Sequence, residues 1–349
     1  MSWKCQIESI GVRLPEKKLT TRELTANLKI PGIDKFGLLT GIQERRICSE
    51  GEDSFSLASD AAIDCLSHSK YRADELDMII SCSITRYKNG LSHYYEPAFS
   101  ILIRKTIRAE KAIAFDISNA CAGMLTGVYI AENYFRRGAI KTCMIVSGEY
   151  ISNLYSHALK NIRTPLSSEI SSLTVGDGGA AVILERVPGN GEGLILSGFT
   201  TLSRYCDLCT GRQNRKSQGG FMRTKAIKIH KVSIKNSFLV VKKALDDNGL
   251  SFDMIDYLIS HQTSRSSIIG GVLKLSDYLG QEPGNVVINL KYTGNTASTT
   301  HFIALYNYLC ENRFRAGDRI MLLCFASGLI IGVVIFKMNE IVNRYGNKN

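Results

Sequence analysis

The chain has 349 residues, of which 44% are hydrophobic and 21% are charged, and its formal net charge at pH 7 is +11. This length and composition are those of a globular protein with a full hydrophobic core, and they exclude a disordered chain and a small disulfide-stabilised scaffold. This positive net charge indicates either a basic surface without a specific partner or an acidic partner. An acidic carrier protein, the phosphates of coenzyme A and nucleic acid are all candidates for such a partner.

Short strand-like runs alternate with helical patterns along the chain, and this alternation predicts an α/β fold. The strand-like runs cover residues 78–81, 112–115, 143–147, 180–184, 257–260, 286–289 and 320–324. The helical patterns cover residues 54–66, 122–136, 233–248 and 299–312. No run approaches roughly 18 uninterrupted apolar residues, so we expect no membrane-spanning helix, and residues 1–16 lack the charged and apolar regions of a signal peptide.

The later part of the chain repeats a sequence pattern of the earlier part. In each, a helical pattern is followed by an acidic turn and then a strand-like run, at residues 74–80 and at residues 252–258. Each part also has a glycine-containing turn before an apolar strand, at residues 176–179 and 327–328. This repeated pattern predicts two similar halves that share one core.

The densest cluster of proline and glycine, residues 187–193, predicts the joint between these halves. We therefore expect an N-terminal half at residues 1–187, which carries the nucleophile discussed below, and a C-terminal half at residues 188–349. The basic, polar stretch at residues 204–231 follows the joint, and it is interpreted as a surface insertion.

Ten cysteines are scattered along the chain, several of them within apolar runs where a free cysteine behaves as a small hydrophobic residue. The spacing is not that of a secreted disulfide framework, so we expect a reducing, cytoplasmic location. Cys206 and Cys209 form a lone C-x-x-C pair without a second pair or nearby histidines, which disfavours a zinc site there. The sequence predicts neither a metal nor a cofactor.

Residues 116–127, with the sequence DISNACAGMLTG, form the sharpest local feature. A strand-like run ends in a turn of small residues, and Cys121 then stands at or near the first turn of a helical pattern. Unpaired backbone N–H groups and the positive end of the helix dipole favour a thiolate there, and the thiolate is the form that attacks a thioester. On this segment alone, a buried core cysteine is an equal alternative.

A thiolate nucleophile needs a proton acceptor and hydrogen-bond donors for the anion that develops on the thioester oxygen. His261 directly follows the strand-like run at residues 257–260, and α/β folds build their sites at such carboxyl ends. Asn295 lies in a glycine-containing turn between a strand-like run and a helical pattern, where its amide can donate a hydrogen bond without titrating. Each residue alone is compatible with an ordinary surface or core position.

Together these segments resemble the ketoacyl-synthase III family of the thiolase superfamily over nearly the whole chain. Five motifs occur in the family's order and at similar spacing. They are residues 40–47 (TGIQERRI), the nucleophile turn DISNACAG, residues 176–181 (GDGGAA), His261-Gln262 and residues 294–296 (GNT). The resemblance implies a thiolase fold, a five-layer αβαβα arrangement of two pseudo-repeated halves, in a homodimer.

The resemblance also implies roles for these residues. Cys121 accepts the first acyl group, and His261 and Asn295 donate hydrogen bonds to the thioester oxygen of the second substrate as its enolate forms. The backbone N–H groups of Cys121 and Gly328 hold the first oxyanion. The implied substrates are acyl thioesters carried by acyl carrier protein or by coenzyme A.

Two departures from the family pattern bear on substrate binding. Ser264 replaces the asparagine of the family's H-Q-A-N motif. Lys35 and Leu39 stand where typical members have the tryptophan and arginine that clamp the adenine of coenzyme A. This second departure favours a substrate held by a carrier protein.

A third departure is Glu96, which precedes Pro97 at a position where typical members carry a phenylalanine. A glutamate there resembles long-chain head-to-head condensing enzymes and α-pyrone-forming ketosynthases, in which the carboxylate enters the partner subunit's site as a general base. A malonyl donor makes its carbanion by losing carbon dioxide, whereas another acyl donor must lose a proton from carbon 2. The alternative for Glu96 is a loop residue in solvent.

The sequence therefore favours a ketosynthase that condenses two acyl thioesters without obligatory decarboxylation, with an α-pyrone or related ring as product. The alternative enzyme is an ordinary initiating synthase that joins an acyl starter to malonyl carrier protein, and Glu96 separates the two. A catalytically silent subunit of a heterodimer is disfavoured because Cys121, His261 and Asn295 are all present. No basic stripe carries interleaved aromatic residues, which disfavours nucleic-acid binding.

Overall fold

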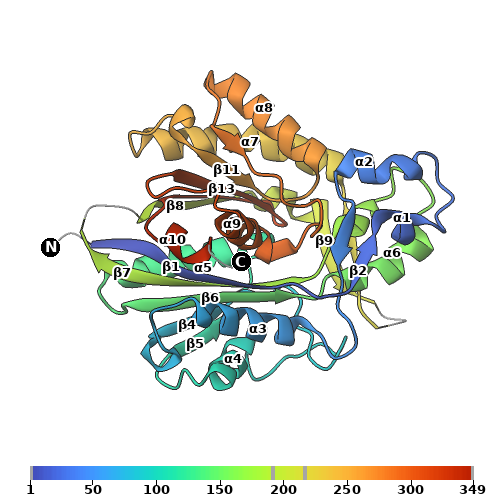
Figure 1. Cartoon of the computed structure of the whole chain (residues 1–349). Helices are drawn as coiled ribbons and strands as arrows, with labels where there is room; N and C mark the ends of the chain where they lie inside the picture. Colours follow the sequence, from blue (N-terminus) through green and yellow to red (C-terminus); the bar gives the residue numbers. More distant parts are fainter. Residues whose placement is uncertain (1–2, 190–192, 215–217, 347–349) are drawn as a thin grey trace.

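The computed structural model of the protein describes residues 3–189, 193–214 and 218–346. Two five-stranded sheets alternate with three layers of helices, giving the αβαβα order that the family resemblance implies (Figure 1). Two helices cover one outer face, two lie between the sheets, and two cover the other outer face. In that order they are α7 (Ala226–Asp246), α8 (Arg265–Leu279), α5 (Gly123–Arg136), α9 (Thr300–Cys310), α3 (Ser54–Ser67) and α4 (Phe99–Ile107).

The two sheets have the same strand order and the same strand directions. The first sheet has the order β5 (Ile113–Asp116), β4 (Met78–Ser81), β6 (Thr142–Glu149), β7 (Gly178–Pro188) and β1 (Trp3–Arg13). The second sheet has the order β12 (Asn285–Val286), β11 (Tyr257–Ser260), β13 (Arg319–Ala326), β14 (Ile330–Lys337) and β8 (Gly193–Thr201). In each sheet the first three strands are parallel, and each of the remaining two is antiparallel to the strand before it. Such a repeated topology is expected of two similar halves.

The predicted joint between the two halves lies between β7, the last strand of the first sheet along the chain, and β8, an edge strand of the second sheet. β7 ends at Pro188 and β8 begins at Gly193. Residues 190–192 of the predicted joint lie outside the described residues. The division of the chain into residues 1–187 and 188–349 stays a prediction.

Helix α3 lies in backbone contact with the first sheet because three strands present glycine to it. A β-carbon at Gly11, Gly148 or Gly179 would lie 2.1 Å from a backbone atom of α3. On the helix side the contact is made with small, fully buried residues such as Ala58 and Ala61. A side chain at any of the three glycines would push the helix off the sheet, so the close packing of this layer depends on them.

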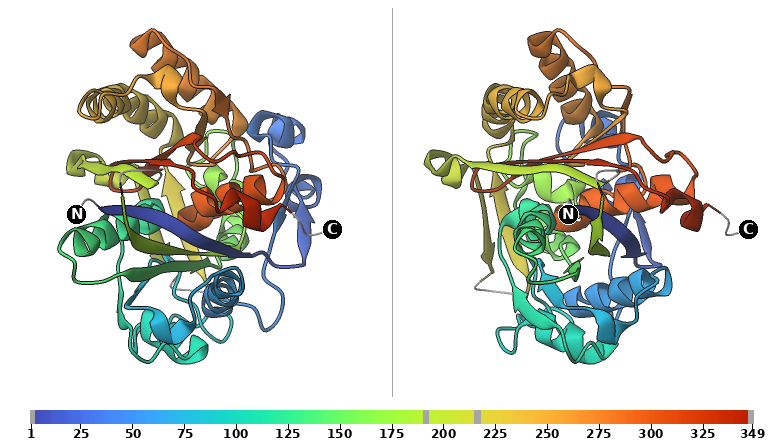
Figure 2. Two further views of the ribbon diagram at one scale, coloured as in Figure 1. Left: turned by 60° about the vertical axis from the view of Figure 1, so that its left-hand side comes forward. Right: turned by 90° about the vertical axis from the view of Figure 1, so that its left-hand side faces the viewer.

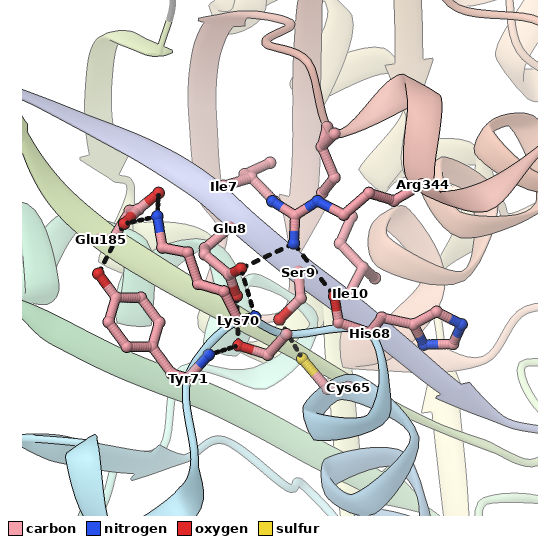
Figure 3. A network of polar contacts seen from close by, with 12 residues as sticks. Ile7, Glu8, Ser9, Ile10, Cys65, His68, Lys70, Tyr71, Glu185 and Arg344 are labelled. Atoms are coloured by element: carbon pink, nitrogen blue, oxygen red, sulfur yellow. Dashed lines mark hydrogen bonds and ion pairs between the residues drawn. The ribbon is translucent and has the colours of Figure 1, made fainter.

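The C-terminal helix α10 (Val342–Tyr345) is tied to β1 through Glu8, a fully buried carboxylate (Figure 3). Glu8 accepts hydrogen bonds from the Ser69 hydroxyl at 2.5 Å and from the Lys70 backbone N–H at 3.0 Å, and it pairs with Arg344 at 2.7 Å. Burial opposes ionisation of this carboxylate, but the three donors outweigh burial and lower the pKa of Glu8. The charge of Glu8 thereby joins β1, the loop after α3 and the last helix.

Short elements gather at one end of the two sheets, and Figure 2 shows the layers from two further sides. These elements are α1 (Thr21–Thr25), α2 (Phe36–Thr40), α6 (Tyr155–Asn161), the pair β2 (Lys18–Thr20) and β3 (Glu44–Arg46), and the pair β9 (Cys209–Gln213) and β10 (Gly220–Thr224). Residues 215–217 of the predicted insertion lie outside the described residues. Among the described residues, no helix is both long and apolar enough to cross a membrane.

Candidate active site

Cys121, His261 and Asn295, which are far apart in the sequence, line one cavity of about 360 Å3. Its walls include the turn before α5, the end of β11, the turn before α9 and the turn between β13 and β14. The facing sides of α7 and α8 extend the cavity with apolar side chains such as Ile234 and Val272. An apolar cavity with a few polar groups is the kind of site that binds an acyl chain and orients its reactive end.

Cys121 lies in η3 (Ala120–Ala122), a single turn between β5 and α5. The preceding Ala120 has φ of +47°, a left-handed backbone conformation that turns the chain sharply from strand to helix. The side chain of Cys121 is partly exposed and lines the cavity. The structure therefore places this residue at the start of a helix, as the sequence predicts.

The protonation state of Cys121 differs from the sequence-based expectation. Burial, together with the nearby Cys209 and Glu149, raises the pKa of the Cys121 thiol, and its own backbone N–H only partly offsets this. The backbone N–H at this turn favours the thiolate, as the sequence predicts, but desolvation of the anion outweighs its effect on the pKa of Cys121. The thiol is neutral at physiological pH, and it must give its proton to an acceptor when it attacks a carbonyl carbon.

His261 directly follows β11 and is almost fully buried, with 4% of its surface exposed. Its backbone N–H donates to the Leu323 carbonyl of β13 at 2.9 Å, which fixes its backbone at the carboxyl end of the sheet. Burial, and to a lesser extent His301, lowers the pKa of His261 to about 3. The imidazole is therefore neutral and carries one N–H donor and one acceptor nitrogen.

Asn295 lies in the turn between β12 and η8 (Ala297–Thr299), and this turn holds its side chain in one orientation. The side-chain oxygen Oδ1 accepts the backbone N–H of Ala297 at 3.0 Å. Gly294, with φ of +65°, and the bond from the Asn295 N–H to the Thr174 carbonyl at 2.9 Å shape the turn. Because Oδ1 is engaged, the amide nitrogen Nδ2 remains as a donor for a molecule in the cavity.

Gly328 lies in the turn between β13 and β14 and has φ of +137°, a backbone conformation that other residues rarely adopt. Its neighbours Ser327 and Leu329 line the cavity, whereas Gly328 is not among the lining residues. Ser264, which replaces the family's asparagine, also lines the cavity. Its hydroxyl accepts the Ser267 backbone N–H at 3.1 Å, so this position caps helix α8.

Glu96 is exposed to solvent and does not line this cavity. It precedes α4, whose first backbone N–H, that of Phe99, donates to the Asp116 carboxylate at the end of β5 at 3.1 Å. β5 is the edge strand of the first sheet, and its Ile113 is 59% exposed. The structure thus places Glu96 at the outer edge of the molecule and outside its own chain's cavity.

Lys35 and Leu39, at the family's adenine-clamping positions, are exposed on a segment whose Phe36 and Thr40 line the cavity. The sequence predicts a surface insertion at residues 204–231, and this prediction is wrong where the stretch lines the cavity. β10 and the start of α7 form part of the cavity wall, with the lining residues Met222, Thr224, Ala226, Ile229 and His230. The signal available in the sequence was the presence of apolar residues within an otherwise basic run.

The two pKa shifts predict how Cys121 reacts as pH changes. Because burial raises the pKa of the thiol and His261 is already neutral above about pH 3, the thiolate fraction should rise steadily from pH 6 to pH 9. We expect the rate of Cys121 alkylation by iodoacetamide to increase about tenfold per pH unit over this range, measured by mass mapping of the modified residue. The exposed Cys206 is the internal control for the reagent. A plateau with a midpoint near pH 7 would show that the helix dipole dominates after all.

The arrangement of these groups is suited to acyl transfer from thioesters. A thiol can bind the acyl group, a neutral imidazole can take the thiol proton, and an imidazole N–H and an amide can stabilise negative charge on a thioester oxygen. All three side chains, those of Cys121, His261 and Asn295, lie on the wall of one apolar cavity.

Comparisons with known proteins identify the family of the chain. Residues 115–202 match the model of the 3-oxoacyl-(acyl-carrier-protein) synthase III family, residues 245–338 match the model of its C-terminal part, and together they span more than half of the chain. The β-ketoacyl-(acyl-carrier-protein) synthase III of Rhodospirillum centenum is 26% identical over 343 residues, covering 97% of this chain and 100% of the relative. The protein of the same name from Clostridium tetani is 29% identical over 313 residues, covering 85% of this chain and 88% of the relative.

Solved structures show the same fold. The 3-oxoacyl-(acyl-carrier-protein) synthase III of Aquifex aeolicus matches with a TM-score of 0.81 at 25% identity, covering 96% of this chain and 100% of that chain. OleA from Xanthomonas campestris matches with a TM-score of 0.83 at 23% identity, covering 96% of this chain and 98% of that chain. These matches confirm the thiolase fold predicted from the sequence. The chain belongs to the 3-oxoacyl-(acyl-carrier-protein) synthase III family of carbon–carbon bond-forming acyltransferases.

Proposed function

We propose that the protein is a ketosynthase that condenses two acyl thioesters by Claisen chemistry through an acyl-Cys121 intermediate. The observation that carries the proposal is the convergence of Cys121, His261 and Asn295 on one apolar cavity. The ten free cysteines of the chain support a reducing location such as the cytoplasm.

In the first half-reaction, the Cys121 sulfur attacks the carbonyl carbon of the first thioester while neutral His261 accepts the thiol proton. The backbone N–H groups of Cys121 and Gly328 hold the oxyanion of the tetrahedral intermediate. The carbon–sulfur bond to the carrier then breaks, and the carrier thiol takes up the proton that Cys121 lost. The product of this step is an acyl group in thioester linkage to Cys121.

In the second half-reaction, the second thioester loses a proton from carbon 2, and its enolate oxygen accepts hydrogen bonds from His261 and from Nδ2 of Asn295. Carbon 2 then attacks the acyl carbon on Cys121. The new carbon–carbon bond forms as the bond to the Cys121 sulfur breaks, and the thiol regains a proton. The neutral state of His261 supports this step, because the imidazole can donate an N–H hydrogen bond without first changing its protonation state.

Glu96, supplied by a second copy of the chain, is the proposed base for carbon 2. Support comes from β5, an edge strand whose exposed Ile113 makes it a template for pairing with another chain. Glu96 lies beside this edge, because α4 is anchored to Asp116 at the end of β5. Condensation of a 3-oxo acyl donor without decarboxylation gives a chain that can close to an α-pyrone or a related ring.

An ordinary initiating synthase, which joins an acyl starter to malonyl carrier protein, is the second candidate. The names of the curated relatives, β-ketoacyl-(acyl-carrier-protein) synthase III, favour it. Such an enzyme needs no base at carbon 2, because loss of carbon dioxide makes the carbanion. The effect of changing Glu96 therefore separates the two candidates.

A basic groove supports an acidic carrier protein as the holder of the substrates. Lys231 and Lys235 on α7 and Lys274 on α8 line the groove, with one acidic residue. The rings of Phe238 and Tyr278 are stacked between these helices with centroids 4.6 Å apart. The same two helices line the cavity, so a carrier protein docked on this groove would stand next to the substrate site.

Reversing two of these charges, with Lys235→Glu and Lys274→Glu, should raise the KM for a carrier-bound acyl thioester about tenfold at low salt, because the lost attraction slows encounter. The difference should shrink as ionic strength rises, as measured by steady-state kinetics. Lys242→Glu with Lys243→Glu is the matched control, since both lysines lie on α7 and pair with aspartates one turn along. Equal changes in KM in the two double variants would contradict docking at this groove.

His261→Ala and Asn295→Ala should each lose condensation by on the order of 10²-fold or more, because each removes a donor to the developing oxyanion. Intact-mass measurement should separate them in the first half-reaction. Asn295→Ala should be acylated at nearly the parental rate, whereas His261→Ala should be acylated more slowly, because the raised pKa of Cys121 makes the thiol dependent on a proton acceptor. His230→Ala, which removes another histidine of the same cavity, is the control. Parental condensation by either variant would place the site elsewhere.

A further inference from the structure

A buried cluster next to the cavity consists of His261, His301 and Cys324. The proposed acyl chemistry uses only one of these residues, His261. One ring nitrogen of each histidine and the Cys324 sulfur all lie within 4.8 Å of one another. The two imidazole rings are stacked with centroids 5.7 Å apart. The three residues come from the end of β11, from α9 and from β13, so the core of the fold holds them together.

Both histidines of this cluster have an unsatisfied ring nitrogen. The Nδ1 atoms of His261 and His301 are buried and have no hydrogen-bond partner within the described part of the chain. Nε2 of His301 lies 3.2 Å from the Leu323 carbonyl and donates its proton there, so Nδ1 carries the lone pair. A histidine whose second nitrogen donates to a backbone carbonyl is the usual form of a metal-binding imidazole. Two buried nitrogens without partners call for a ligand that both can share.

We propose that His261, His301 and Cys324 form a binding site for a divalent cation of the Zn2+ class. Two imidazole nitrogens and a thiolate are a ligand set that Zn2+ binds tetrahedrally, with the fourth position left for water. Ligand atoms of such a site stand about 3.5 Å apart, so the present separations require only small closing movements. Binding converts the Cys324 thiol to a thiolate and releases one proton to solvent. Mg2+ and Ca2+ are excluded, because they prefer oxygen ligands.

The effect of a bound cation on activity rests on the proposed function, because His261 is one of the proposed catalytic residues. A cation bound to His261 occupies a ring nitrogen and holds the imidazole on the metal. With Nδ1 on the cation, the proton of the ring lies on Nε2, so the ring can still donate a hydrogen bond but can no longer take the proton of Cys121. Zinc therefore inhibits condensation, and removal of zinc restores it.

The binding test uses metal-free protein titrated with Co2+, which reports tetrahedral thiolate coordination through its visible absorption and a thiolate-to-cobalt band in the near ultraviolet. We expect one Co2+ per chain, displaced by Zn2+. Cys324→Ser should lose the thiolate band, and both Cys324→Ser and His301→Gln should bind at least on the order of 10²-fold more weakly, because each removes a direct ligand. Thermal unfolding of each variant establishes that it is folded, and the two variants change different elements.

A double variant of the C-x-x-C pair, Cys206→Ser with Cys209→Ser, is the matched control, because these two thiols are another possible source of a thiolate band. The band should persist in this control. Three outcomes would each overturn the proposal. They are loss of the thiolate band in this control, survival of the band in both Cys324→Ser and His301→Gln, and the absence of stoichiometric Co2+ binding to the parent.

Activity provides a readout that separates this site from the proposed function. Zn2+ should inhibit condensation by the parent and a chelator should restore it, whereas Cys324→Ser should retain a larger share of its own zinc-free rate at the same zinc concentration. If the zinc-free parent condenses no acyl thioesters but binds one Co2+ with the expected ligand pattern, the proposed function fails and the site stands. Condensation that is insensitive to saturating Zn2+ would overturn the inhibitory role and leave the proposed function intact.

Discussion

Cys121→Ala is expected to abolish both acylation and condensation while the protein stays folded. The substitution removes the sulfur to which the acyl group binds, and an alanine fits a turn that already has Ala120 and Ala122 on either side. The measurement is the intact mass of the protein after incubation with acyl thioesters of graded chain length. The parent should gain the mass of one acyl group, and the chain lengths that it accepts should report the length of the apolar cavity between α7 and α8.

The control for this experiment is Cys209→Ala, because Cys209 is a second thiol on the wall of the same cavity. Cys209 begins strand β9 directly after the carboxyl end of the 3-10 turn η6 (Ser203–Leu208), so it does not itself stand at the start of a helix. The Cys209→Ala protein should therefore still gain an acyl group. A Cys121→Ala protein that gains the same mass as the parent would show that another residue is the nucleophile.

The layered fold could be predicted because each half repeats a short, strongly marked unit. The acidic turns at residues 74–77 and 252–256 precede largely apolar runs, and the strands there, β4 and β11, have the predicted bounds. These strands lie at corresponding places in the two sheets, next to the edge strands β5 and β12. A strand buried on both faces appears in a sequence as an uninterrupted apolar run, which is why it is easily found.

The elements that were not predicted lack such a local signal. β1 and β8 are edge strands that mix polar and apolar residues. Helix α8 contains Gly270 and Gly271 in its middle, which lower its helix propensity, and tertiary packing supplies its stability instead. Helix α4 has only nine residues, too few for a clear helical period.

The meeting of Cys121, His261 and Asn295 at one cavity could be predicted from the sequence, whereas the protonation state of Cys121 could not. Cys121, His261 and Asn295 each follow a strand or precede a helix, and parallel strands bring such ends together. The direction of the pKa shift of Cys121 was not predictable, because burial depends on residues such as Met222 that come from a distant part of the chain. The approach of His301 and Cys324 to His261 likewise depends on how α9 and β13 pack beside β11.

Glu96→Gln should leave acylation of Cys121 intact and reduce condensation with a non-malonyl donor by roughly 10² to 10⁴, the usual contribution of a positioned general base. The amide keeps the shape of the side chain and removes the proton acceptor. Acylation survives because it requires no base at carbon 2 of the donor. A malonyl donor should be affected far less, because decarboxylation replaces proton abstraction. Intact mass reports the first half-reaction, and product analysis with the two kinds of donor reports the second.

Because Glu96 lies at the edge of its own chain and outside its own cavity, its action requires a second copy, and mixed dimers test this directly. A dimer of one Glu96→Gln chain and one Cys121→Ala chain pairs a parental Cys121 with a parental Glu96 across the interface at one of its two sites. If chains exchange at random, equal mixing should restore about a quarter of the parental rate, whereas each variant alone stays inactive toward the non-malonyl donor. A base acting within its own chain gives no recovery, since neither chain then has both residues. Equal loss of condensation with both donors in Glu96→Gln, or no loss with either, would contradict the general-base role and favour the ordinary initiating synthase.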